Sequence, residues 1–229
     1  MGRTVLQKRR VDWRLCFVAD SEAAAGKDLL ELVSRAVAGG ATLVQLRVKA
    51  WTDRRFLDLA VAVRRALTPA GVPLIVNDRP DIARACRAAG VHLGQSDLPI
   101  AAAREILGRR ALIGLSAATP GQAVEGERAG ADYLGVGPVF ATPSKADAGA
   151  PLGLGAIRRI RRVTGLPVLA IGGVGPDSAA EVVRAGADGV AVISAITGAA
   201  DPAGEAARFL EAIGPSRIRR RPSSRGGRP

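Results

Sequence analysis

The 229-residue sequence predicts an α/β fold in which a parallel sheet closes into a (β/α)8, or TIM, barrel. Short apolar runs alternate with helical patterns along most of the chain, and they give eight strands with a helix after each. Hydrophobic residues make up 48% of the chain and aromatic residues only 3%, which suits an aliphatic sheet covered by helices. An open doubly wound sheet has the same rhythm, but eight units and glycine-rich ends of the last two strands favour closure.

The predicted elements follow one another from residue 15 to residue 212. The first strand is Leu15–Ala19, which ends at Asp20, and the helix after it covers 28–38. The second strand is Leu43–Arg47, and its helix covers 53–67. The later strands are predicted near 74–76, 91–93, 112–115, 132–136, 168–171 and 189–193, and the later helices near 80–89, 99–107, 120–129, 155–163, 176–185 and 202–212.

A weak internal repeat supports eight similar units. The tetrapeptide Ala-Gly-Ala-Asp occurs at 129–132 and again at 185–188, each time before an apolar strand. Glycine ends the preceding helix, and the small residues turn the chain into the next strand.

The net charge of +12 is concentrated at the two ends of the chain. Ten Lys or Arg residues and no acidic residue lie within 1–10 and 214–229, so subtracting ten from +12 leaves about +2 for 11–213. We therefore predict a basic leader at 1–13, a barrel domain at 14–213 and a disordered Arg-rich tail at 214–229. The tail has no interleaved aromatic residues, which argues against a nucleic-acid partner.

The cysteines and the hydropathy pattern predict a cytoplasmic protein. Cys16 and Cys86 lack the spacing of a zinc site or a disulfide framework, so we expect buried, reduced thiols. The leader has no apolar signal core, and no run approaches the roughly 18 apolar residues that span a membrane. We expect no membrane partner, and the sequence leaves open whether the protein forms a homo-oligomer.

Two aspartates at neighbouring strand ends predict a metal site. Asp78 follows the third strand and Asp97 follows the fourth, and adjacent strands lie roughly 4.8 Å apart. Two such carboxylates could share one hard cation such as magnesium. Asp78 alone could equally form an Asx turn before the helix at Pro80, but the matching Asp97 favours a metal.

Two groups of polar residues predict anion binding at the same end of the barrel, where barrel enzymes place their chemistry. Gln45, Arg47 and Lys49 alternate along one strand and would point into one mouth, although the two cations could merely be solvated. The segment 135–155 lacks a helical period and resembles a binding loop. The residues that follow the sixth, seventh and eighth strands suit a phosphate. They are Thr142, Ser144, Lys145, Gly172, Gly173 and Ser194. For Gly172 and Gly173, a tight turn without a ligand is the alternative.

The only histidine, His92, lies within the fourth strand, where we expect it to pack in the core. A hydrolase that depends on a Ser-His pair is therefore not favoured.

Five groups of segments follow one another along the predicted barrel: VQLRVK (44–49), VNDRPDIA (76–83), GVHLGQSD (90–97), ADYLGVGPVFATPSK (131–145), and LAIGGV (169–174) with VAVISAI (190–196). Taken together in this order, they resemble the thiamine-phosphate synthase family. The resemblance implies a magnesium-dependent transferase with two small-molecule substrates. It would join a pyrimidine-methyl diphosphate to the nitrogen of a thiazole phosphate, giving thiamine phosphate and pyrophosphate.

The resemblance also implies roles for individual residues. Magnesium would be held by Asp78 and Asp97. The pyrimidine diphosphate would be bound by Gln45, Arg47, Lys49, Asn77, Ser116 and Lys145. Of these, the catalytic set would be Arg47, Lys49, Ser116 and Lys145. The thiazole phosphate would be bound by Thr142, Ser144, Gly153, Gly172, Gly173, Ile193 and Ser194.

Two other functions remain as alternatives. A thiazole tautomerase of related sequence shares the barrel and the glycine-rich phosphate site, but it typically lacks the two aspartates and uses a histidine in its site. A non-catalytic phosphate or nucleic-acid binder would use the Arg-rich tail. Asp78, Asp97 and the placement of His92 within a strand favour the synthase.

Overall fold

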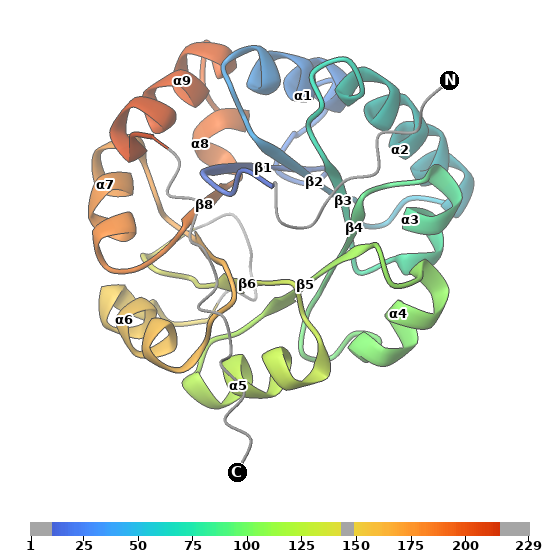
Figure 1. Ribbon diagram of the computed structural model, residues 1–229. Coiled ribbons are helices and arrows are strands. Elements are labelled where there is room, and N and C mark those ends of the chain that lie inside the picture. The colour runs from blue at the N-terminus through green and yellow to red at the C-terminus, as the bar shows by residue number, and fades with distance from the viewer. Residues whose placement is uncertain (1–10, 143–148, 216–229) are drawn as a thin grey trace.

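Eight parallel strands form a closed barrel in the order β1 to β8, which confirms the predicted TIM barrel. The computed structural model describes residues 11–142 and 149–215. Each strand pairs with the next, and β1 (Leu15–Asp20) closes the ring by pairing with β8 (Gly189–Val192). The helices form an outer ring, in which α9 (Pro202–Ile213) lies beside α1 (Leu29–Ala38) (Figure 1).

The remaining elements alternate along the chain. The strands are β2 (Leu43–Arg47), β3 (Leu74–Asn77), β4 (Gly90–Leu93), β5 (Leu112–Ser116), β6 (Tyr133–Val136) and β7 (Val168–Ile171). The helices are α2 (Asp53–Leu67), α3 (Pro80–Cys86), α4 (Ile100–Leu107), α5 (Pro120–Ala129), α6 (Gly153–Val163), α7 (Pro176–Arg184) and α8 (Ser194–Thr197).

The boundaries differ from the predicted ones in a few places. α3 ends at Cys86 and not at residue 89, because Arg87 adopts a left-handed conformation with a φ of 58°. α6 begins two residues earlier than predicted, at Gly153. β8 ends at Val192, and the short helix α8 that follows it was not predicted. Four residues are too few to give a helical period.

Side-chain caps define where several helices begin. The carboxylate of Asp28 accepts hydrogen bonds from the backbone N–H groups of Leu30 and Glu31 at the start of α1. Thr119 and Gln122 form a reciprocal capping box at the start of α5. These caps satisfy N–H groups that have no partner within the helix, and they place the preceding strand-to-helix loops.

The core has two layers, one between sheet and helices and one inside the barrel. The inner layer is mostly aliphatic, as the composition predicts, and it contains Tyr133 as its largest side chain. The ring of Trp13 lies 4.9 Å from that of Tyr133, so the predicted leader includes a residue that packs on the barrel. Cys16 is completely buried in the same layer, and this burial raises the pKa of its thiol to about 12.

Glycine inside the barrel makes room for two large polar side chains. A Cβ atom on Gly114 would lie 2.2 Å from Cζ of Tyr133 and 2.5 Å from Nδ1 of His92. A Cβ atom on Gly135 would lie 2.9 Å from Cε1 of His92. The absence of side chains at these two positions therefore allows His92 and Tyr133 to point into the barrel.

The two Ala-Gly-Ala-Asp segments form equivalent contacts. Nη2 of Arg104, on α4, donates to Oδ2 of Asp132 at 2.8 Å, and the same oxygen accepts from the backbone N–H of Ile113 at 2.9 Å. Nη1 of Arg161, on α6, donates to Oδ2 of Asp188 at 3.1 Å, and that oxygen accepts from the backbone N–H of Val168 at 2.9 Å. Each arginine thus ties a helix to the beginnings of the next two strands.

The residue before the first strand also contacts the residue after the last helix. Nη1 of Arg14 donates to the carbonyl oxygen of Gly214, which follows α9, at 3.4 Å.

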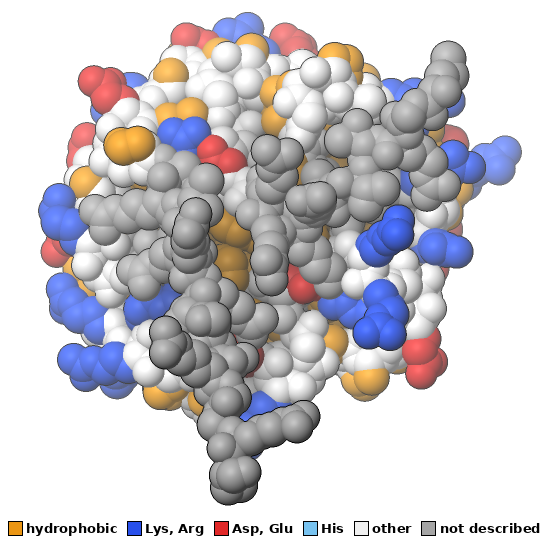
Figure 2. All heavy atoms as spheres, in the orientation of Figure 1, with side chains coloured by type: hydrophobic (Ala, Val, Ile, Leu, Met, Phe, Trp, Pro, Cys, Tyr) orange, Lys and Arg blue, Asp and Glu red, His pale blue; other side chains and the backbone are white. Residues whose placement is uncertain are grey.

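Figure 2 shows Lys and Arg side chains around the rim of one face, with acidic side chains among them. Within the described residues, every helix is too short or too polar to cross a lipid bilayer.

Candidate active site

The carboxyl ends of β2, β3 and β4 bring the two predicted metal ligands and a lysine together. Asp78 directly follows β3, and Nζ of Lys49 donates to its Oδ2 at 2.7 Å. Asp97 lies in the loop after β4, where its Oδ2 accepts from the backbone N–H of Gly94 at 2.6 Å. The carboxyl groups of Asp78 and Asp97 are close enough to influence each other's titration.

The pKa values of the two aspartates shift in opposite directions. Burial raises the pKa of Asp78, but the hydrogen bonds with Lys49 and Asp97 and the charge of Lys49 together outweigh it and hold the value below the usual range. Burial also raises the pKa of Asp97, and the neighbouring Asp78 carboxylate raises it further. Asp97 is therefore harder to ionise because the Asp78 carboxylate lies beside it, and a cation bound by both carboxylates would relieve this repulsion.

The backbone at Asp78 is held in an uncommon conformation. Its φ is 61°, in the left-handed region, and its N–H donates to the carbonyl oxygen of His92 at 2.8 Å. The N-cap residue of α3 is Arg79, which makes no side-chain cap, and the Asp78 carboxylate accepts from Lys49. The Asx turn weighed for Asp78 is therefore not formed. Such conformations persist where surrounding contacts enforce them, often at functional sites.

The donor set fits magnesium better than a metal with many protein ligands. Among the described residues, three or more His, Cys, Asp or Glu side chains do not gather at any one point where they could hold a metal ion. Magnesium is commonly held by one or two carboxylates, with water and substrate phosphates completing its coordination. The Asp78–Asp97 pair is consistent with such an ion.

Arg47 lies at the same mouth, but its guanidinium group already has two acidic partners. Nη1 donates to Oδ2 of the buried Asp20, and it also donates to Oε2 of Glu22 at 3.0 Å. Burial lowers the pKa of Arg47, but these two acids raise it by more, so the group stays charged. The partners were not predicted, because they depend on the β1–β2 register, which places Asp20 beside Arg47.

Gln45 and Asn77 lie on the adjacent strands β2 and β3, where the register places Gln45 beside Ile75. Gln45 lies two residues before Arg47 on β2, is buried in the barrel, and contacts the hydroxyl of Tyr133. Asn77 is the last residue of β3 and is half-buried next to Asp78.

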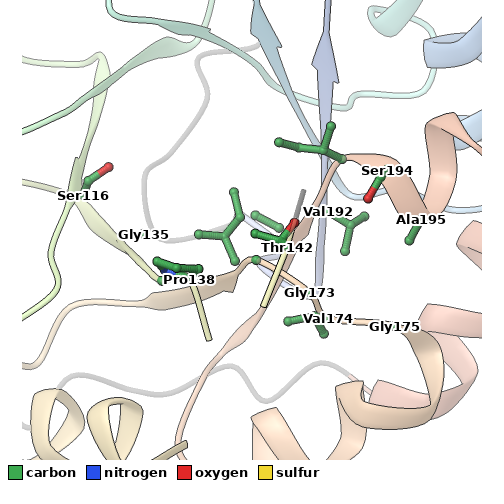
Figure 3. A pocket seen from close by; sticks show the side chains of 15 residues that line it. Ser116, Gly135, Pro138, Thr142, Gly173, Val174, Gly175, Val192, Ser194 and Ala195 are labelled. Atoms are coloured by element: carbon green, nitrogen blue, oxygen red, sulfur yellow. The ribbon is translucent and has the colours of Figure 1, made fainter. Parts of the chain in front are cut away.

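A cavity of about 480 Å³ lies across the barrel, at the ends of β5 to β8. Figure 3 shows Ser116, on β5, at one side of it and Ser194, at the beginning of α8, at the other. The predicted residues that line the cavity are Ser116, Thr142, Gly172, Gly173, Ile193 and Ser194.

Both glycines of the β7–α7 loop are required by the geometry of the cavity wall. Gly172 and Gly173 have φ values of 94° and 66°. A Cβ atom on Gly172 would lie 2.6 Å from Cβ of Pro138, and one on Gly173 would lie 2.5 Å from the carbonyl oxygen of Ala141. The loop is thus a tight turn that also exposes its backbone to the cavity.

His92 links this cavity to the barrel interior. It is buried in β4, as expected, but its Nε2 lies 3.0 Å from Oγ of Ser116 and its Nδ1 lies 3.1 Å from the hydroxyl of Tyr133. The side chain of Gln95 fixes the same residue by donating to the Ser116 carbonyl oxygen at 2.6 Å. The contact with Ser116 was not predicted, because it depends on which face of each strand turns inward.

Three predicted residues are not brought to the cavity by the described part of the structure. Ser144 and Lys145 lie outside the described residues. Gly153 begins α6, where its N–H donates to the carbonyl oxygen of Val139 at 3.0 Å, and it is not part of the cavity wall.

Comparisons with known proteins agree on one family. A family model described as thiamine monophosphate synthase matches residues 15–196. The thiamine-phosphate synthase of Moorella thermoacetica is 50% identical over 201 residues, which cover 88% of this chain and 96% of that protein. That of Chloroflexus aurantiacus is 49% identical and covers 89% of this chain and 93% of that protein.

Solved structures support the same assignment. The thiamine phosphate pyrophosphorylase of Pyrococcus furiosus superposes with a TM-score of 0.83 at 37% identity, covering 90% of this chain and 98% of that one. A 3-hexulose-6-phosphate synthase, at 22% identity and a TM-score of 0.63, shares the fold. The family match over most of the barrel and these identities place the chain in the thiamine monophosphate synthase family.

Proposed function

We propose that this enzyme is a magnesium-dependent thiamine-phosphate synthase whose site has two halves. One half, at Lys49, Asp78 and Asp97, binds the diphosphate of the pyrimidine substrate. The other half, the cavity at the ends of β5 to β8, binds the thiazole phosphate. The observation that carries the proposal is this arrangement of a carboxylate pair and a glycine-walled cavity of about 480 Å³ on one mouth, in a chain about 50% identical to synthases.

The proposed reaction breaks the bond between the pyrimidine methylene carbon and the diphosphate oxygen. The electron-rich aminopyrimidine delocalises the positive charge left on that carbon. The thiazole nitrogen then donates its lone pair to form the new carbon–nitrogen bond, and pyrophosphate leaves. This nitrogen carries no proton, so no general base is needed for bond formation. The chemistry is consistent with a lone histidine held between Tyr133 and Ser116.

The residues act chiefly on the leaving diphosphate and on substrate orientation. Asp78 and Asp97 would hold magnesium, which would supply positive charge to stabilise the leaving diphosphate. Arg47 and Lys49 add cationic hydrogen-bond donors on the same side, and Gln45 and Asn77 add neutral ones. Ser116, oriented by His92, contacts the pyrimidine. Lys145 and Ser144, outside the described residues, complete the two halves of the proposed site.

The thiazole phosphate is bound mainly by neutral donors. The backbone of Gly172 and Gly173 approaches the cavity without side chains in the way. The hydroxyl groups of Thr142 and Ser194 and the backbone at Ile193 face the same space. Such donors fix an anion without adding a second positive centre beside the reacting nitrogen.

A coupling assay tests the proposal. Purified protein is incubated with both substrates, with magnesium or with a chelator, and thiamine phosphate and pyrophosphate are quantified. We expect both products in equal amounts, only with magnesium. Isomerisation of a thiazole without coupling would contradict the synthase and support the tautomerase alternative.

Substitutions at the carboxylate pair test the metal assignment. We expect Asp78→Asn and Asp97→Asn to lower magnesium-dependent turnover by about 100-fold or more, because each removes a charged ligand. The matched control is Asp81→Asn, three residues further on, where the carboxylate pairs with Arg79 at the surface. This control should keep its turnover. Full activity in both pair variants would refute the metal site.

A further inference from the structure

Asp20 is a buried charge that the proposed reaction does not use. Among the residues that the structure describes, it is the only fully buried carboxylate, with 0% of its surface exposed. It ends β1 and lies directly beside Arg47 in the register of β1 and β2. Burying an ionised carboxylate is costly unless it is paired and hydrogen-bonded, so its presence at the mouth requires an explanation.

The two oxygens of Asp20 have separate partners. Oδ1 accepts from the backbone N–H groups of Glu22 and Ala23, at 2.9 and 3.0 Å. Oδ2 accepts from Nη1 of Arg47. The backbone bonds therefore fix the carboxylate, and the fixed carboxylate holds the guanidinium group in one orientation.

Glu22 binds the same nitrogen atom from the solvent side. Its Oε2 lies 3.0 Å from Nη1 of Arg47, and its side chain is 64% exposed, whereas that of Asp20 is 1% exposed. Exposed ion pairs contribute little and exchange readily, but breaking a buried pair by removing one partner is costly. An incoming diphosphate, which is a stronger acceptor than one carboxylate, would therefore replace Glu22 and not Asp20.

We propose that Asp20 is a positioning residue that aims Arg47 at the diphosphate, and that Glu22 is an exchangeable partner that occupies Arg47 until the diphosphate binds. The inference rests on the proposed function for the placement of the diphosphate beside Arg47. It predicts effects of opposite sign for two acidic residues that bind the same nitrogen atom.

The test measures the dissociation constant of inorganic pyrophosphate with magnesium by calorimetry, and KM and kcat for the pyrimidine diphosphate. Asp20→Asn keeps an oxygen for the two backbone donors but turns an amide N–H₂ toward Arg47, so its orientation is lost. We expect the dissociation constant and KM to rise about tenfold or more, with a smaller change in kcat. Glu22→Gln removes the competitor, so both constants should fall about two- to fivefold.

Glu31→Gln, on the exposed side of α1, is the matched control. It changes the net charge by the same amount near the same end of the chain but lacks the contact with Arg47, so both constants should stay unchanged. Thermal unfolding of each variant separates loss of orientation from loss of fold. If Asp20→Asn does not fold, the sign of the Glu22→Gln effect decides the question.

Several outcomes would overturn the inference. These are an increase or no change in the constants of Glu22→Gln, unchanged constants in a folded Asp20→Asn, and no pyrophosphate binding by the wild-type protein. Failure of the proposed function is recognised separately, as a wild-type protein that binds pyrophosphate but forms no coupled product. In that case the variants' dissociation constants still decide the roles of Asp20 and Glu22.

Discussion

Single residues at the barrel mouth carry charges that are already paired before any substrate is present. Lys49 is bound to Asp78, and Arg47 is bound to Asp20 and Glu22. The mouth is therefore less positive than its sequence suggests, and the diphosphate binding that we propose there would require an exchange of partners. The sequence located Lys49, Asp78 and Arg47 at strand ends, because the βα rhythm alone defines those ends. It could not reveal the Asp20–Arg47 contact across 27 residues, which depends on strand register.

A single methyl group at Gly114 tests the packing of the inner polar residues. Gly114→Ala would place Cβ 2.2 Å from Tyr133 and 2.5 Å from His92, so both rings must shift. We expect a loss of roughly 1–3 kcal/mol in the free energy of unfolding, measured by chemical denaturation. Gly121→Ala, in the first turn of α5, is the control, since its nearest neighbour lies 3.8 Å away and alanine favours helix. Equal stability of the two variants would show that the interior repacks freely.

At the scale of elements, the two arginines that tie helices to strands lie on α4 and α6, two units apart. Arg104 and Arg161 each reach an aspartate that also accepts a backbone N–H group from the preceding strand. The repeated Ala-Gly-Ala-Asp segment was recognised in the sequence as a helix-to-strand turn. The arginine partners were not, because they lie 28 and 27 residues before their aspartates and show no pattern of their own.

Removing one of these arginines should weaken the barrel away from its catalytic mouth. We expect Arg104→Met to lower the free energy of unfolding by about 1–3 kcal/mol, because Asp132 and backbone carbonyl groups lose a largely buried donor. Turnover of the folded variant should stay unchanged. Arg54→Met is the control, because Arg54 is 88% exposed and its ion pair with Asp58 is long, at 3.9 Å. We expect that control to change stability by no more than about 0.5 kcal/mol. A similar loss in both variants would contradict a special role for Arg104.

For the molecule as a whole, the barrel class, the order of its elements and most of their bounds were predicted from the sequence. The prediction succeeded because aliphatic runs of strand length and helical periods are both local properties. Closure of the sheet followed from the number of units and was confirmed by the pairing of β1 with β8. The packing of Trp13 on Tyr133 was missed, because a basic segment gives no sign that one ring within it enters the core.

The contact between Arg14 and Gly214 shows that the two ends of the barrel segment lie close together, so the βα unit at which the chain begins could be changed. Because both ends of the barrel segment meet there, a linker of about six Gly and Ser residues should join residue 214 to residue 11. New termini can then be opened between Ala70 and Gly71, in an exposed turn between α2 and β3. We expect this circular permutant to fold cooperatively and to retain coupling activity, as measured by circular dichroism and by product formation.

The same linker with new termini between Gly172 and Gly173 serves as a comparison, because that cut lies in the wall of the cavity at the ends of β5 to β8. It should lose activity even if it folds. Failure of the Ala70–Gly71 permutant to fold would mean that the native chain order is needed to form the barrel. Success would mean that the eight βα units form a circle whose starting point can be moved, so that the permuted chain could be synthesised beginning with β3.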